Sequence, residues 1–230
     1  MGLRLDVPVL HGSLVRLEPL AMGHAPDLAQ AAEEDRSSYG FTLVPRAAEV
    51  TAYVAAQSAR PGVTPFAQVR MRDGMAVGCT TFCDPRMWPD RQDLRAIEVG
   101  WTWLAASAQG AGINAEVKRL LFTYAFETLG VVRVDLKTDA RNERSRRAIE
   151  RIGARFEGVL RSWSPSRAPG EAGMLRDSAM FSVVAAEWPA VNSALGARLT
   201  NAAQIDPTSP MPGQSHMGSV QACRGAAPPE

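Results

Sequence analysis

In the first quarter of the chain, the spacing of apolar and polar residues is typical first of a β-strand and then of two α-helices. SLVRLEPL (residues 13–20) alternates between apolar and polar side chains, which predicts a strand. Two Ala-rich stretches, HAPDLAQAAEED (24–35) and AAEVTAYVAAQSA (47–59), have apolar residues at helical spacing and predict two helices.

The middle of the chain predicts three strands. FAQVRMRDGMAVGCTTF (66–82) contains two alternating runs joined across Asp73-Gly74, which is typical of a hairpin. AIEVGWTWL (96–104) has almost no polar break, so we expect a strand with both faces covered.

The next part alternates between helices and strands. INAEVKRLLFTYAFETLG (113–130) has an apolar stripe and ends at Gly130, which predicts a helix. NERSRRAIERIG (142–153) predicts a short helix with Asn142 as its N-cap. The remaining segments comprise three predicted strands and a final turn or short helix: VVRVDLKT (131–138), ARFEGVLR (154–161), DSAMFSVV (177–184) and AAEWPAVNSAL (185–195).

This order predicts an α/β (α+β) fold with a mixed, mostly antiparallel sheet of about seven strands and helices on both faces. We expect one domain over residues 1–199. Residues 200–230 have little periodicity and much Pro, Gly and Ser, which predicts a disordered tail.

Composition narrows the class of protein. The 230 residues are 46% hydrophobic and 21% charged, as in ordinary globular proteins, and the net charge of +1 gives no reason to expect a nucleic-acid or membrane partner. No segment approaches the roughly 20 apolar residues of a membrane span, and the N-terminus lacks a signal-peptide core.

The cysteines favour a reducing, cytoplasmic compartment. Their number is odd and small, at positions 79, 83 and 223, so we expect no disulfide framework. Cys79 and Cys83 are four residues apart, but the three histidines are scattered, so two buried small side chains are a better interpretation than a metal site.

The segment QGAGIN (109–114) places two glycines directly before a predicted helix, as an anion-binding turn would require. A P-loop needs four residues between its glycines and then Lys-Ser or Lys-Thr, and Ile113-Asn114 does not fit. A dinucleotide fingerprint G-x-G-x-x-A does fit residues 110–115, with Asp135 as a ribose acid. However, Asp135 lies inside its strand and the chain lacks repeated strand–helix units.

A third interpretation is a grip on a diphosphate. The start of a helix leaves about four amides without partners and carries roughly half a positive charge, and Gly110 and Gly112 allow close backbone approach because they have no Cβ. The structural alternative is a glycine-containing turn capped by Ser107 and Asn114.

The surrounding residues favour the third interpretation. Gln109, Gly112 and Asn114 fall on the positions of a Gln/Arg-x-x-Gly-x-Gly/Ala pattern, although Asn114 replaces the usual Gly or Ala and Ala106 a common Pro. With EVGWTWLAASAQGAGINAE, VDLKTDARNERSRRAIERIGARFEGVLR and RDSAMFSV, the chain resembles GNAT N-acetyltransferases over roughly residues 10–190. The resemblance is greatest to the RimJ/RimL-like branch, which acetylates N-terminal amines of ribosomal proteins and various small amines.

The resemblance implies acetyl-CoA, or a related acyl-CoA, as co-substrate. The pantetheine arm would lie between the strand 96–104 and the strand after it, bonded by the backbone of Trp103 and Leu104 and by Asn142, which alternatively serves only as a helix cap. Arg147, in a run of four arginines that otherwise forms a solvated helix face, would meet the 3′-phosphate. The diphosphate would be bound by Gln109, Gly110, Ala111, Gly112, Ile113 and Asn114.

The resemblance also implies a direct attack of the amine on the thioester. Glu98 occupies the usual place of the base, and its alternative is a surface carboxylate at the sheet edge. Ser145 would protonate the leaving thiolate, since the usual tyrosine position holds Ile149; its alternative is an exposed serine beside a helix cap.

Three aromatic residues, Tyr39, Phe41 and Trp101, would shape the acceptor pocket or belong to the core.

The function expected is therefore N-acyl transfer to a primary amine, either a peptide N-terminus or a small molecule, without metal. Two alternatives remain open: a nucleotide-binding oxidoreductase of the NAD type, and a GNAT-like domain that binds CoA without turnover. Related proteins often form homodimers, which no feature of the sequence decides.

Overall fold

The computed structural model describes residues 3–205. The strands in this part of the chain form one eight-stranded sheet. The strand order is β1-β2-β3-β4-β5-β6-β8-β7, and every neighbouring pair is antiparallel except β5 with β6. The mixed, mostly antiparallel sheet is thus confirmed, with the two-residue β1 as an eighth strand. The strands are β1 (Leu10–His11), β2 (Val15–Pro19), β3 (Val63–Arg70), β4 (Ala76–Met87), β5 (Leu94–Leu104), β6 (Arg133–Asp139), β7 (Arg155–Pro165) and β8 (Leu175–Val184).

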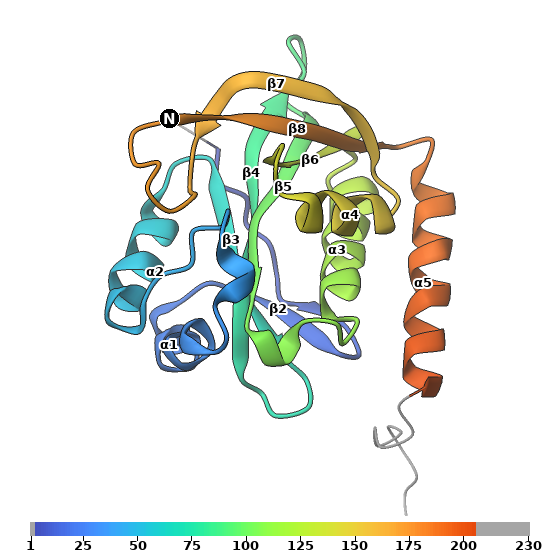
Figure 1. Cartoon of the computed structure of the whole chain (residues 1–230). Helices are drawn as coiled ribbons and strands as arrows, with labels where there is room; N and C mark the ends of the chain where they lie inside the picture. Colours follow the sequence, from blue (N-terminus) through green and yellow to red (C-terminus); the bar gives the residue numbers. More distant parts are fainter. Residues whose placement is uncertain (1–2, 206–230) are drawn as a thin grey trace, which may run out of the picture.

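The helices cover both faces of this sheet. In Figure 1, α1 and α2 lie on one side of the central strands, and α3 and α5 lie on the other. The α-helices are α1 (Ala25–Glu33), α2 (Val50–Ala59), α3 (Ile113–Thr123), α4 (Glu143–Arg151) and α5 (Trp188–Ile205). Shorter turns are η1 (Met22–His24), η2 (Ser37–Tyr39), η3 (Ala47–Glu49), η4 (Ala106–Ala108) and the π-helical η5 (Tyr124–Thr128), which continues α3.

The C-terminal helix is longer than the sequence analysis predicted. Trp188 stacks on Phe126 with ring centroids 5.4 Å apart, and Leu195 on the same side of the helix is 1% exposed. This contact with α3 and its extension supports a helix that continues to Ile205. The boundary expected at Thr200 therefore falls inside α5, and the rest of the expected tail, with Cys223, lies outside the described residues.

The strands β5 and β6 separate soon after they meet. Their parallel pairing covers three positions, Ala96–Glu98 against Arg133–Asp135. Beyond this point β5 stays paired with β4 as far as Leu104, with one register shift, while β6 stays in register with β8 as far as Asp139. Because each strand follows its other neighbour, a gap opens between them, and it begins directly after Glu98.

A buried carboxylate fixes the turn between β1 and β2 to the first turn of α3. One oxygen of Glu116 accepts bonds from the amide and hydroxyl of Ser13, and the other accepts bonds from the amides of Leu14 and Val15, at 2.6–2.9 Å. The side chain is 5% exposed, so these four donors replace water for the charge.

We expect Glu116→Gln to lower the free energy of unfolding by about 2 kcal/mol, because the new NH₂ group would face two donors in place of an acceptor. Urea unfolding would measure this effect. Glu150→Gln, on the exposed face of α4, is the matched control and should change stability by less than about 0.5 kcal/mol. Equal effects of the two substitutions would contradict the anchoring role of Glu116.

Candidate coenzyme and acceptor site

The glycine loop lies at the far end of the gap between β5 and β6. Gly110 and Gly112 have φ angles of +79° and +78°, in the left-handed region that glycine adopts without strain. A Cβ on Gly110 would meet no atom within 4 Å, so the loop is open on that side.

The loop presents a row of free amides. Within residues 3–205, the five backbone N–H groups of Gly110–Asn114 have no hydrogen-bond acceptor, and the first helical bonds run from the amides of Ala115 and Glu116 to the Gly112 carbonyl. Ser107 does not cap the helix, because its amide and hydroxyl donate to Glu34, and no side chain caps α3 at its N-terminus. The structural alternative of a capped turn is therefore not what forms.

The side chain of Gln109 holds the loop rather than pointing away from it. Its Nε2 donates to the carbonyl of Leu104 at 2.8 Å and to Ser38 Oγ at 3.1 Å, and its Oε1 accepts from Arg144 at 2.6 Å. This one carboxamide joins β5, η2 and α4 around the loop.

The two backbone residues expected at the pantetheine arm face opposite ways. The carbonyl of Trp103 points toward β4, since it accepts from Gln68 at 3.0 Å and lies 2.1 Å from where a Cβ on Gly78 would sit. Leu104 points the other way, and its carbonyl accepts from the hydroxyl of Tyr39 at 2.8 Å. Of the two, Leu104 is the residue whose backbone faces away from β4, and the expectation for the Trp103 backbone does not fit this geometry.

Helix α4 brings polar and basic groups to the loop. Asn142 caps the helix through its Oδ1, which accepts the Ser145 amide at 3.0 Å, so the amide nitrogen of Asn142 stays available for another contact. Ser145 is half-buried and Ile149 is 8% exposed.

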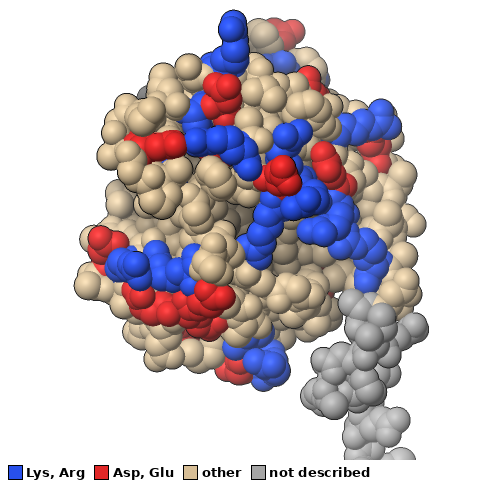
Figure 2. Space-filling model, viewed as in Figure 1, with Lys and Arg blue, Asp and Glu red and all other residues tan. Residues whose placement is uncertain are grey.

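Basic side chains gather over α4 on the face shown in Figure 2, beside a hollow. Arg147 lies 3.4 Å from Glu143 and is mostly exposed, whereas Arg144 reaches the loop through Gln109. Arg147 is the member of this run expected at the coenzyme, but Arg144 is the one that contacts the glycine loop, through Gln109.

A cavity of about 560 Å³ opens beside Glu98. Glu98 is 3% exposed, and a Cβ on Gly100 would come within 2.9 Å of its Oε1, so the glycine makes room for the carboxylate. A register shift between β4 and β5, with a φ of +49° at Trp101, turns the Trp101 ring into the same cavity, where Arg60 stacks on it at 4.5 Å. The sheet-edge alternative for Glu98 is therefore excluded, because this carboxylate is buried at the centre of the sheet.

The other two aromatic residues lie elsewhere. Tyr39 is 9% exposed and packs edge-on against Trp103 at 6.4 Å, close to the glycine loop. Phe41 lies under the guanidinium of Arg141 at 5.2 Å. Of the three residues expected at the acceptor, Trp101 is the one that lines the cavity.

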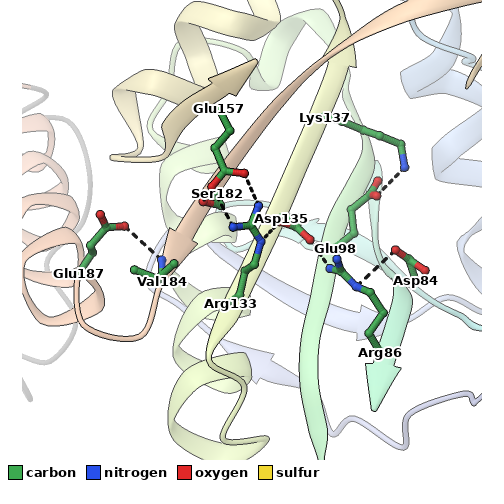
Figure 3. A network of polar contacts seen from close by, with 10 residues as sticks. All are labelled: Asp84, Arg86, Glu98, Arg133, Asp135, Lys137, Glu157, Ser182, Val184 and Glu187. Carbon is green, nitrogen blue, oxygen red and sulfur yellow. Dashed lines mark hydrogen bonds and ion pairs between the residues drawn. The ribbon is translucent and has the colours of Figure 1, made fainter. Parts of the chain in front are cut away.

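Charged groups form ion pairs along the part of the sheet that contains Glu98. Lys137 donates to Glu98 Oε2 at 2.5 Å, and the buried carboxylate of Asp135 is paired with Arg86 and Arg133 (Figure 3). The burial of Cys83 beside Glu98 raises the pKa of its thiol, so this cysteine stays protonated. Because Asp135 is held in these ion pairs inside β6, its carboxylate is not available to bind the ribose of a dinucleotide.

Two residues of this region, Lys118 and Lys137, were not expected from the sequence patterns. Lys118 on α3 is 5% exposed, and its Nζ donates to Thr102 Oγ1 at 2.5 Å. Among the described residues no carboxylate lies within ion-pair distance of it. The signal that could have found both is composition, because they are the chain's only lysines among 25 basic Lys and Arg residues.

Comparison with known proteins decides the family. Residues 15–155, more than half of the chain, match the family model described as "Acetyltransferase (GNAT) domain". The chain belongs to the GNAT family. Between them, the family membership and the presence of only one parallel strand pair in residues 3–205 exclude the NAD-type oxidoreductase.

Known relatives agree with the GNAT assignment. A Bacillus subtilis (strain 168) protein named "Putative ribosomal N-acetyltransferase YdaF" is 37% identical over 94 residues, which are 41% of this chain and 48% of that protein. The chain thus matches about half the length of this curated relative. A GCN5-related N-acetyltransferase from Brucella melitensis has a TM-score of 0.73 at 29% identity, covering 83% of this chain and 85% of that one.

Mycobacterium smegmatis RimJ, solved with CoA-disulfide, shares the fold with a TM-score of 0.64 at 21% identity, covering 80% and 88% of the two chains. Over residues 3–205, no helix has the length and apolar character needed to cross a membrane. The same residues contain no group of three or more His, Cys, Asp or Glu side chains placed to hold a metal ion.

The buried amine of Lys118 predicts a pH-dependent stability. Burial lowers its pKa from 10.5 to about 7, so below pH 7 the folded state carries a desolvated ammonium, and the penalty disappears as the pH rises toward 10.5. The free energy of unfolding of the wild type, measured relative to that of Lys118→Met, should rise by about 3 kcal/mol between pH 7 and pH 10. Urea unfolding of both proteins across this range measures the difference, in which all other titrations cancel. A flat difference would show that the pKa of Lys118 is not lowered.

Proposed function

We propose that the chain is an N-acetyltransferase, which transfers an acetyl group from acetyl-CoA to a primary amine. The observation that carries the proposal is the row of free amides at residues 110–114, at the end of a gap between two strands. Family membership supports the same reaction.

The coenzyme half of the site would use main-chain groups. Five amides at the positive end of α3 suit a diphosphate, which offers several acceptor oxygens and negative charge. From there the pantetheine arm would run along the gap beside Leu104, within reach of the Asn142 amide nitrogen, and Arg144 and Arg147 would lie near the phosphates. A larger acyl group in place of acetyl stays within the proposal.

The acceptor half would use the cavity beside Glu98, which residues of β4, β5 and β6 line. Glu98 would take the proton of the attacking amine, directly or through water, and Ser145 would give a hydrogen bond or proton to the leaving thiolate. A backbone N–H beside Leu104 would stabilise the oxyanion. No nucleophilic Ser or Cys is needed, which agrees with the raised pKa of the buried Cys83 thiol.

A peptide N-terminus fits this machinery better than a lysine side chain. Freeing an α-amine at pH 7 costs about 1 kcal/mol, against about 4 to 5 kcal/mol for a lysine amine. The name of the YdaF relative points to ribosomal proteins, and small amines remain the second class of acceptor. A cytoplasmic location and a homodimer belong to the same proposal.

Gly110→Asp should weaken acetyl-CoA binding at least roughly tenfold, because a carboxylate would face the diphosphate. Isothermal titration with acetyl-CoA measures the change. Gly130→Asp is the matched control, since Gly130 also has a positive φ and no atom within 4 Å of a Cβ, but lies at the other end of the α3 and η5 helical segment. If both substitutions weakened binding equally, the diphosphate would not lie on this loop.

The reaction itself is tested by thiol release from acetyl-CoA with a panel of short peptides and small amines. We expect turnover with at least one peptide, and a fall in kcat/KM of about 10²-fold or more in Glu98→Gln, which keeps the size of the side chain but cannot accept the proton. Binding of acetyl-CoA without thiol release across the panel would instead favour a GNAT domain that binds CoA without turnover. Full activity of Glu98→Gln would remove Glu98 as the base.

A further inference from the structure

We propose that Lys137 is an internal acetyl acceptor, so that the protein acetylates its own β6 strand at this side chain. The inference rests on the proposed acetyl transfer and adds a modification site to it. It follows from where the Lys137 amine lies, and from how few amines the chain contains.

The amine of Lys137 already occupies the place of an acceptor. Its Nζ donates to Glu98 Oε2 at 2.5 Å, which is the contact that an attacking amine would make with its base (Figure 3). Both residues line the 560 Å³ cavity, and the Lys137 side chain is 23% exposed while that of Glu98 is 4% exposed. A partly exposed amine is thus held on a buried carboxylate.

The position along the strands also places this amine near the thioester. Glu98 and Asp135 form the last parallel pair before β5 and β6 separate, and Lys137 lies two residues further along β6. The gap that would hold the pantetheine arm runs from the glycine loop to this point. The reacting end of the arm and the Lys137 amine would therefore meet where the two strands join.

The choice of residue type supports a chemical role. Of the 25 Lys and Arg residues, only Lys118 and Lys137 are lysines, and the two cations that pair with Asp135 on this part of the sheet, Arg86 and Arg133, are arginines. A guanidinium does not lose its proton at ordinary pH and cannot attack a carbonyl, whereas a lysine can. If charge alone were needed beside Glu98, arginine would serve as it does elsewhere on this sheet face.

The step balances without further reactants. The ammonium of Lys137 gives one proton to Glu98, and the free nitrogen pair attacks the thioester carbonyl. The C–S bond then breaks, and the thiolate leaves with the electron pair and takes up the second proton, which the nitrogen loses as it becomes an amide. Glu98 releases the first proton to solvent. The products are Nε-acetyl-Lys137 and free CoA, and the ion pair with Glu98 is lost because the new amide carries no charge.

The test is mass spectrometry of the full chain after incubation with acetyl-CoA and no added amine. We expect a mass increase of one acetyl group, and in a tryptic digest the peptide 134–141 should appear uncut at Lys137 and acetylated. The rate constant should not change with protein concentration, because donor and acceptor lie in one molecule.

Two variants separate enzymatic transfer from chemical acetylation. Lys137→Arg keeps the positive charge beside Glu98, and it should abolish both the mass increase and the stoichiometric release of CoA that occurs without acceptor. Glu98→Gln keeps Lys137 and should slow its acetylation at least tenfold. Urea-unfolded wild-type protein is the control for uncatalysed reaction, and thermal unfolding checks that both variants fold.

The outcomes distinguish this inference from the proposed function. Turnover with added amines while Lys137 stays unmodified would overturn the inference alone. Acetylation of Lys118 or the N-terminal amine instead, or an equal rate at Lys137 in Glu98→Gln and in unfolded protein, would also overturn it. The absence of CoA release with and without any amine would overturn the proposed function together with the inference.

Discussion

The separation of β5 from β6 is the constraint on which the site depends. A parallel pair satisfies its backbone groups only while the strands run together, and here each strand is held by an antiparallel neighbour that diverges from the other. Main-chain groups on the facing edges then lack strand partners over the gap. An extended ligand with amide groups of its own, such as the proposed pantetheine arm, would be a suitable partner for such edges.

Charge burial is the second constraint, and the fold meets it by pairing. Glu98, Asp135 and Asp139 are all less than 4% exposed, and each contacts a cation: Lys137, Arg86 with Arg133, or Arg141. A buried carboxylate without such a partner would favour its protonated form. Lys137 is the cation that pairs with Glu98, so an incoming ammonium must compete with it for this carboxylate.

Periodicity was enough to predict the order of the elements, because alternation and helical spacing are local properties of residues such as those in 66–82 and 113–130. It was not enough for α5, where Trp188 and Leu195 form a helix face only by packing on distant residues. The glycine loop was also local and was found by pattern. The opposite orientations of the Trp103 and Leu104 carbonyls depend on Gln68 and Tyr39, far away in sequence, and no local pattern reports them.

The two lysines show how a rare residue type carries information that periodicity does not. Lys118 lies in a helix and Lys137 in a strand, and the spacing of the apolar residues around them already predicts both elements. The pattern would be the same with any other polar residue at these two positions. The structure places their amines near the same stretch of β5, Lys118 on Thr102 and Lys137 on Glu98. An arginine at either position would keep a permanent charge there. Lysine leaves both groups able to exchange a proton, which is the property that a site built for amine chemistry requires.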